Sequence, residues 1–163
     1  MASITGTRQV VLVSCRAQLD MLGKKVHKDN IIALSWHMPV SFNPVMYAIA
    51  IGKTRFSRKI IDESGVFVVN FISDKLEEKA LFVGRNSGLH MDKWSKAKLT
   101  KEEAESVDCC RIKQAIGYLE CEVASQVEAG DHIIYFGKVL KQELKKNSKR
   151  LFQVEGNKFT TTV

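Results

Sequence analysis

A run of eight residues, Gly52–Lys59, combines cations with hydroxyl side chains directly after an apolar stretch. The preceding Val45–Ile51 is apolar throughout, which predicts a buried strand, and Thr54–Ser64 is predicted to be a helix that Gly65 ends. The first turn of a helix attracts anions through its free N–H groups, and an arginine can bind two phosphate oxygens. The segment therefore predicts a phosphate site, with candidate ligands Lys53, Thr54, Arg55 and Ser57.

The same segment also has a purely structural interpretation, in which Thr54 only caps the helix and the cations are only solvated. A P-loop is excluded, because the glycine required five residues before Gly52 is replaced by Tyr47. No GxGxxG motif follows a predicted strand, which excludes a Rossmann fold. No metal site or serine nucleophile is predicted, because GxSxG is absent and no ligand spacing joins His27, His37, His90 and His132.

The 163 residues carry a net charge of +7, with 45% apolar and 26% charged residues. This length and composition predict a single domain over residues 1–163. No apolar run approaches the ~20 residues needed to cross a bilayer, and no signal peptide is recognised, so we expect no membrane association. The four cysteines form no CxxC pair, which favours reduced thiols in a cytoplasmic protein.

The predicted elements are mostly strands. They lie at Val10–Cys15, Ile31–Trp36, Val45–Ile51, Val66–Ile72, Val107–Lys113, Ala115–Val127, His132–Leu140 and in a closing hairpin of Leu151–Val154 with Lys158–Thr162. Gly23–Asn30 is a predicted turn and His37–Pro44 a predicted loop, and helical segments are expected after Ser73 and after Asp92. Several strands follow one another without a crossover helix, so the fold class is mainly β, an antiparallel barrel with short helices inserted.

Several segments match, in their order and spacing, a known pattern. They are Asn30-Ile31-Ile32-Ala33-Leu34-Ser35-Trp36, Ser41-Phe42-Asn43-Pro44-Val45-Met46, Lys53-Thr54-Arg55-Phe56-Ser57, Glu63-Ser64-Gly65, Phe67-Val68-Val69-Asn70, Ser87-Gly88, Asp92-Lys93-Trp94 and Gly130-Asp131-His132. From about Arg8 to Thr160 the chain resembles the flavin reductase-like family, whose fold is the FMN-binding split β-barrel. It is most similar to the flavoredoxin and archaeal ferric reductase branch, and departs where Pro44-Val45 replaces a frequent Pro-Pro.

The resemblance implies a homodimer that binds FMN near the subunit interface. It assigns the phosphate to Lys53–Ser57, and it counts Asn30 among the cofactor-binding residues. It places Ser35 and Trp36 beside the isoalloxazine ring and His132, as the catalytic residue, near the nicotinamide. It also makes Arg85, Ser87 and Lys93 candidates for polar contacts to the flavin of either subunit.

The resulting hypothesis is an oxidoreductase that passes a hydride from NAD(P)H to FMN and electrons on to an acceptor, such as a ferric chelate, free flavin or a partner protein. Two alternatives stay open. The first is a flavin-binding electron carrier that does not oxidise NAD(P)H directly. The second is a small basic barrel that binds nucleic acid, although the phenylalanines fall mostly in apolar runs rather than beside exposed cations. The residues leave FMN against FAD, and NADH against NADPH, undecided.

Overall fold

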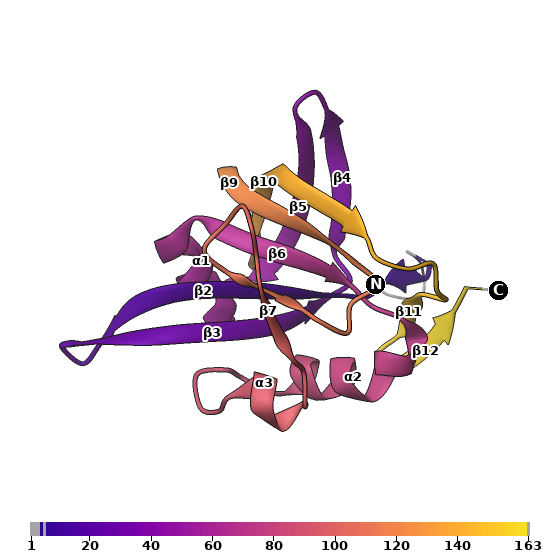
Figure 1. Cartoon of the computed structure of the whole chain (residues 1–163), viewed down its shortest axis with the longest axis horizontal. Helices are drawn as coiled ribbons and strands as arrows, with labels where there is room; N and C mark the ends of the chain where they lie inside the picture. The colour runs from indigo at the N-terminus through magenta and orange to yellow at the C-terminus, as the bar shows by residue number, and fades with distance from the viewer. Residues whose placement is uncertain (1–3, 5, 163) are drawn as a thin grey trace.

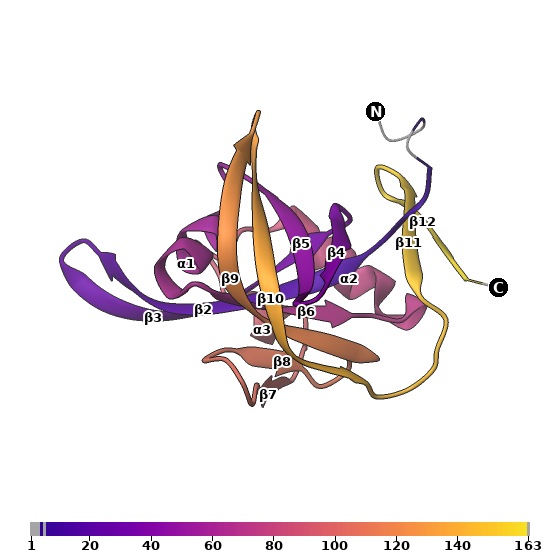
Figure 2. The ribbon, with the colours of Figure 1, turned by 90° about the horizontal axis from the view of Figure 1, so that it is seen from above.

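The computed structural model describes residue 4 and residues 6–162. Its largest element is an antiparallel sheet with the strand order β3-β2-β6-β9-β10-β5-β4. The strands are β2 (Val11–Met21), β3 (Lys24–Leu34), β4 (His37–Phe42), β5 (Val45–Gly52), β6 (Val66–Phe71), β9 (Gly117–Ala129) and β10 (His132–Leu144). Figures 1 and 2 show these strands bending around one another, with β4 and β5 at one end and the β2–β3 hairpin extending from the other. The predicted mainly β, split-barrel fold class is confirmed.

Helices and small sheets complete the structure. These are the two-residue β1 (Arg8–Gln9), α1 (Phe56–Ser64), the short helix η1 (Asp74–Leu76), α2 (Glu77–Arg85), α3 (Lys93–Lys96), β7 (Lys101–Glu103), β8 (Cys110–Ile112), β11 (Leu151–Glu155) and β12 (Lys158–Thr161). Gly65 ends α1 in the left-handed conformation at φ 69°, as predicted. The expected helical turn after Asp92 is α3, whose first N–H groups Asp92 caps.

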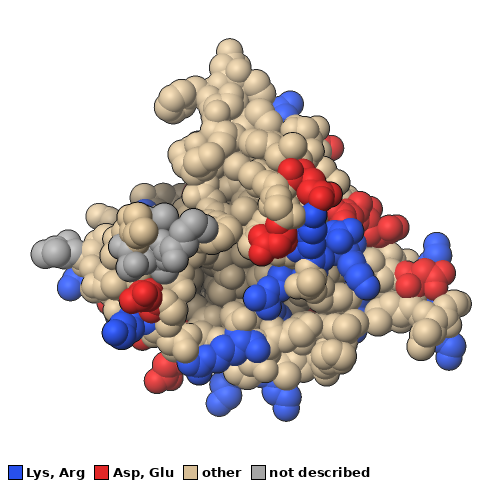
Figure 3. Space-filling view, turned by 180° about the vertical axis from the view of Figure 1, so that it is seen from behind, with Lys and Arg blue, Asp and Glu red and all other residues tan. Residues whose placement is uncertain are grey.

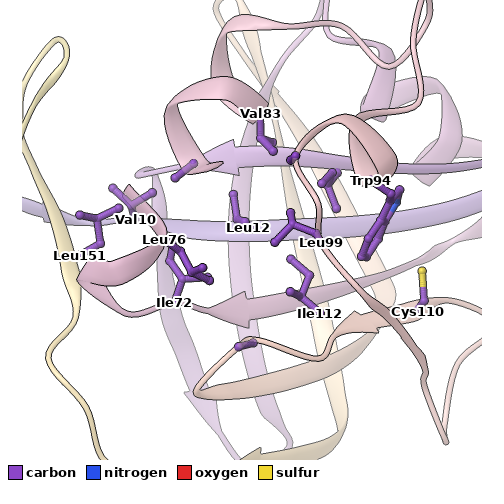
Figure 4. Close-up of a cluster of buried hydrophobic side chains, with 14 residues drawn as sticks. Val10, Leu12, Ile72, Leu76, Val83, Trp94, Leu99, Cys110, Ile112 and Leu151 are labelled. Carbon is purple, nitrogen blue, oxygen red and sulfur yellow. The ribbon is translucent and has the colours of Figure 1, made fainter. Parts of the chain in front are cut away.

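The buried side chains form two main cores. One fills the barrel beneath α1, and the other lies between the β2–β3 strands and the segment carrying α2 and α3. Figure 4 shows this second core, with Leu12 and Ile112 from strands facing Val83 of α2 and Trp94 of α3. The second core fixes α2, α3 and the loop between them against the end of β3.

Several predicted elements differ from the structure in their extent: the predicted strand Val10–Cys15 is part of β2, which continues to Met21, and the predicted helix Thr54–Ser64 begins at Phe56. Gly23–Asn30 is not a turn, because only residues 22–23 turn and β3 runs from Lys24. The predicted loop His37–Pro44 contains the strand β4, which lies at the edge of the sheet. Pro39 lies beside an irregularity in the strand register, and an edge strand tolerates a proline because its missing N–H can face away from the sheet. Val107–Lys113 is reduced to β8, Cys110–Ile112.

All four cysteines are unpaired and buried. Burial raises the pKa of Cys15 and of Cys121 to about 12. Among the described residues no group of His, Cys, Asp and Glu side chains is arranged to hold a metal ion. Of the helices formed by these residues, none has the length and apolar character needed to span a membrane.

Candidate functional site

A cavity of about 280 Å³ lies where β3, β5, α1, the end of α2 and the start of β10 meet. Nine of the eleven residues predicted from the sequence line it: Asn30, Ser35, Trp36, Thr54, Arg55, Ser57, Ser87, Lys93 and His132. Apolar side chains such as Ile32, Leu34 and Phe56 form the rest of the wall. Figure 3 shows a hollowed face of the molecule on which basic and acidic side chains gather.

The first turn of α1 forms one wall of this cavity. Arg55 is the residue before the helix, and its backbone N–H donates to Gly52 O at 2.9 Å, which turns the chain from β5 into α1. Thr54 therefore precedes the cap position that the sequence suggested for it. The Arg55 guanidinium has no hydrogen bond or carboxylate partner among the described residues. Its charge and the free N–H groups of the helix make this wall electropositive.

Lys53 does not line the cavity. Its ammonium group forms an ion pair with Glu128 on β9, and its backbone N–H donates to Asp131 O at 2.9 Å. Arg85 is also outside the first cavity. It lines a neighbouring cavity of about 240 Å³ that shares Ser35 and Gly84 with the first.

Asn30 and Ser57 lie together at the cavity wall, with 3% and 1% of their surfaces exposed. Asn30 Nδ2 donates to Ser57 Oγ at 2.9 Å. Gly88 packs directly against the same amide, since a Cβ at this position would lie 2.0 Å from Asn30 Oδ1. The three residues join β3, α1 and the loop after α2.

Lys93 is buried beside this group, with 4% of its surface exposed. Its Nζ donates to the carbonyl oxygens of Val83 and Asn86, each at 3.2 Å. Val83 O belongs to the last turn of α2, where helix carbonyls lack partners. Burial, with a smaller contribution from the charge of Arg55, lowers the pKa of Lys93 to about 8. A cation of this kind stabilises the loop and adds positive potential to the cavity.

Two aromatic rings form another part of the wall. The Trp36 and His132 ring centroids are 4.7 Å apart, with the ring planes tilted by 30°. His132 Nδ1 lies 2.6 Å from Asp131 Oδ1, and its Nε2 lies above Gly52, 3.8 Å from where a Cβ would stand. Trp36 is 44% exposed, which leaves a flat apolar surface accessible. Such a surface suits a planar ring.

Some contacts at the site were not predicted from the sequence. The Ser35 hydroxyl donates to Gln153 Oε1 of β11 at 2.7 Å, across 118 positions of sequence. Asn86 also lines the cavity, and its side chain donates to Phe82 O at 2.8 Å. No periodicity or motif marks Gln153, whereas Asn86 stands between Arg85 and Ser87, both of which were predicted to contact the flavin.

The sequence model of the flavin reductase like domain matches residues 5–160. This chain belongs to the flavin reductase-like family. The fold of this chain resembles that of the NADH:FAD oxidoreductase of Streptomyces globisporus, with a TM-score of 0.84 and 18% identity over 99% of this chain and 90% of that one. It also resembles the flavoredoxin of Methanosarcina acetivorans, with a TM-score of 0.83 and 22% identity over 96% and 86% of the two chains.

Curated relatives match a shorter part of this flavin reductase-like chain. An uncharacterised protein of Archaeoglobus fulgidus is 36% identical over 115 residues, which are 71% of this chain and 65% of that protein. The matched segments span between 40% and 65% of the first three curated relatives, less than two thirds of their length.

Proposed function

We propose that this chain is an FMN-dependent oxidoreductase that accepts a hydride from NADH or NADPH and passes electrons to an acceptor, such as a ferric chelate, free flavin or a partner protein. The observation that carries the proposal is the wall of one cavity, where Arg55 at the N-terminus of α1, without a carboxylate partner among the described residues, lies near the Trp36–His132 ring pair. A phosphate and a planar ring joined by a short chain match these two features. Family membership supports the same conclusion.

The donor set fits the phosphate of FMN. Arg55 supplies a charged fork, Thr54 and Ser57 supply hydroxyl groups, and the first N–H groups of α1 point toward the same wall. Every one of these groups donates hydrogen bonds, which a phosphate dianion accepts. Gly52 lies between Arg55 and His132, since a Cβ there would stand 3.5 Å from Arg55 Cγ and 3.8 Å from His132 Nε2.

Flavin, when bound, supplies the redox chemistry, so the protein need not provide a nucleophile or a general acid. The residues of this chain bind and orient. In this proposal Trp36 offers an apolar surface for one side of the ring system, and His132, whose ring lies beside that of Trp36, contacts the nicotinamide. Ile32, Leu34 and Phe56 exclude water from the inner wall.

The decisive experiment mixes the purified protein with FMN and either NADH or NADPH without oxygen, and follows flavin absorbance. Bleaching by one donor is the expected result. If flavin binds and neither donor bleaches it, the reductase proposal is wrong and the protein is a flavin-binding electron carrier. Parallel titrations with FMN and FAD identify the preferred flavin. A purified protein that is colourless and binds neither flavin, but shifts single-stranded DNA in a salt-dependent manner, would support the nucleic-acid alternative.

His132 has a narrower proposed role at the nicotinamide face. Replacing it with alanine should slow anaerobic flavin reduction at least about tenfold, because a positioned group near the reacting atoms contributes on that order. The FMN affinity should change little, since the anion ligands come from α1. Stopped-flow reduction rates and FMN titrations separate the two effects, and an equal loss in both would contradict the assignment.

We also propose a homodimer formed through the β4–β5 hairpin. Its apolar side chains are unusually exposed, with Phe42 at 97%, Met38 at 59% and Val45 at 44%. A shallow apolar cavity continues along the same strands toward Trp36. Contiguous apolar surface of this kind is typical of an interface, and its proximity to Trp36 favours a flavin site near the second subunit.

A further inference from the structure

Asn30 has a different role from the direct contacts proposed for Arg55 and Thr54. We propose that Asn30 is a positioning residue that fixes the Ser57 hydroxyl as a hydrogen-bond donor to the phosphate of the flavin. The inference rests on the proposed function and deepens it by assigning specificity for a phosphorylated flavin to a buried pair.

The hydrogen bond between the two side chains sets the direction of the Ser57 hydroxyl. Asn30 Nδ2 carries only hydrogens, so at 2.9 Å from Ser57 Oγ it donates and the hydroxyl oxygen accepts. The hydroxyl proton is then left for another acceptor. The Cys15 thiol lies close to Ser57 and is a weak acceptor, which leaves the proton available to a ligand oxygen in the cavity.

The orientation of the amide is held from the opposite side by Gly88. The space that a Cβ would occupy at Gly88 is filled by Asn30 Oδ1, which leaves the amide no room to swing toward the loop. Lys93 holds the same loop through Asn86 O, 3.2 Å from its Nζ. The Cys15 thiol lies 3.8 Å from Asn30 O and 4.0 Å from Ser57 O, which brings β2 against both backbones.

This arrangement selects for an acceptor-only ligand. A hydroxyl held as a donor gains a strong, charge-assisted bond with a phosphate oxygen. It gains less from the terminal hydroxyl of riboflavin, which is neutral. Because Asn30 Nδ2 donates to Ser57 and Oδ1 packs against Gly88, the removal of Asn30 is expected to act through the serine rather than through the ring pocket.

A double-mutant cycle tests the coupling. Dissociation constants for FMN and for riboflavin are measured by flavin fluorescence for the wild type, Asn30→Ala, Ser57→Ala and the double variant. Each single substitution should weaken FMN about tenfold, the factor for one hydrogen bond to a charged group, and riboflavin less than about twofold. The double variant should bind FMN no worse than Ser57→Ala, because the effect of Asn30 passes through Ser57.

Two further variants test the donor role of Asn30 and control for the loss of a hydroxyl in α1. Asn30→Asp preserves shape but replaces the donor with an acceptor that captures the Ser57 proton, so FMN should weaken at least as much as in Asn30→Ala. Ser64→Ala makes the same substitution at the other end of α1, where the hydroxyl donates to Ile60 O, and should leave both affinities unchanged. Thermal unfolding of each variant shows that it is folded.

The outcomes distinguish this inference from the proposed function. Losses for Asn30→Ala and Ser57→Ala that multiply in the double variant, or an equal loss for FMN and riboflavin in Asn30→Ala, overturn the positioning role while the flavin site stands. A wild-type protein that binds neither flavin overturns both. The inference is supported if the wild type binds FMN tightly and the double variant binds FMN no worse than Ser57→Ala.

Discussion

The cations near the cavity differ in the groups that already neutralise them. Lys53 forms an ion pair with Glu128, and Arg58 Nε lies 2.9 Å from Asp62 Oδ2. Within the part of the chain that the structure describes, Arg55 has no such partner, and Lys93 has only backbone carbonyls. A cation without a carboxylate has its full charge available to an incoming phosphate. Lys53, Arg55 and Lys93 were all predicted to contact the flavin, and their different partners separate them.

This difference predicts unequal effects of two alanine substitutions. Arg55→Ala should weaken FMN binding by about 10- to 100-fold, because it removes a bidentate, charge-assisted contact. Lys53→Ala should weaken FMN binding less than about threefold, because Lys53 does not line the cavity and its ammonium is already paired with Glu128. The loss of that exposed ion pair should itself cost little stability. Riboflavin titrations provide the control and should be unaffected by both. Equal losses for FMN and riboflavin in Arg55→Ala would remove the phosphate role.

The buried ammonium of Lys93 predicts a pH dependence. Its pKa falls from an ordinary 10.5 to about 8 on burial, so between these values the unfolded chain binds a proton that the native chain does not. Lys93 therefore makes the free energy of unfolding rise with pH in this window. FMN affinity should fall over the same range, since the cavity loses a positive charge.

Titrations of FMN binding from pH 7 to 10 check this prediction. Bound phosphate favours the charged ammonium, so the loss of affinity should be centred above pH 8 in the complex. In Lys93→Met the dependence should flatten, and riboflavin serves as the neutral control. A dependence that survives unchanged in Lys93→Met would assign it to another group.

Residue types and spacing predicted the part of the cavity wall at the start of α1, Thr54, Arg55 and Ser57. The family resemblance supplied the other predicted wall residues, Asn30, Ser35, Trp36, Ser87, Lys93 and His132. The features that were not predicted depend on contacts between distant positions. The direction of Lys53 is set by Glu128, 75 positions away, and the hydroxyl of Ser35 by Gln153. A local pattern carries no information about such partners, which only the strand pairing brings into reach.

At the scale of elements, the β9–β10 ladder has an irregularity that a glycine permits. The register shifts between Phe136 and Gly137, and a Cβ at Gly137 would lie 2.5 Å from Phe67 Cζ and 2.9 Å from Cys121 Cβ. β10 therefore crosses closely over the barrel core on its way from the cavity. The core below has no room for an additional methyl group.

Gly137→Ala should consequently lower the free energy of unfolding by about 1–3 kcal/mol, the range for overpacking a core. Gly84→Ala is a matched control within the helix α2, because a Cβ at Gly84 would make an ordinary 3.6 Å contact with Ala33 Cβ of β3. It should leave stability unchanged or raise it slightly, as expected for alanine in a helix. Urea unfolding measures both, and a Gly137→Ala variant as stable as the wild type would contradict the close crossing.

The predicted bounds of secondary-structure elements were wrong where strands extend beyond the core. The β2–β3 hairpin extends into solvent (Figure 1), so the residues near Lys24 and Lys28 need no apolar alternation and their polar run suggested a turn. In β4, Pro39 suggested a loop, yet an edge strand tolerates it. The strand β6, which is buried from Phe67 to Asn70, had a clear sequence signal. The predicted burial of Val45–Ile51 holds only in part, because Val45 is exposed and neighbouring residues of β5 are half-buried.

At the scale of the whole molecule, the fold class followed from the abundance of strands and the lack of crossover helices. The strand order could not be predicted in the same way, since β6 pairs with β9 and β10 with β5 across long stretches of chain. The side chains that meet across these pairings come from distant parts of the sequence, so no local pattern marks them. The resemblance to a known family supplied the arrangement that periodicity alone could not.

The exposed apolar hairpin predicts how the assembly responds to charge. Phe42→Glu should convert the proposed dimer to a monomer, because a carboxylate cannot be buried unpaired at an apolar contact. Leu22→Glu is the matched control, since Leu22 is fully exposed at the tip of the other long hairpin, and it should leave the dimer intact. Light scattering coupled to size exclusion gives the mass of each. A wild type that is monomeric would contradict the proposal.

The burial of all four cysteines also makes the protein suitable for site-specific labelling. All four thiols are shielded from water, and burial raises the pKa of Cys15 and Cys121, so we expect slow reaction with maleimides and disulfide dyes. A single cysteine introduced on the surface would therefore accept a fluorophore selectively, without removal of the native ones. In the unmodified protein, the rate of dye incorporation becomes a direct gauge of how often the barrel opens.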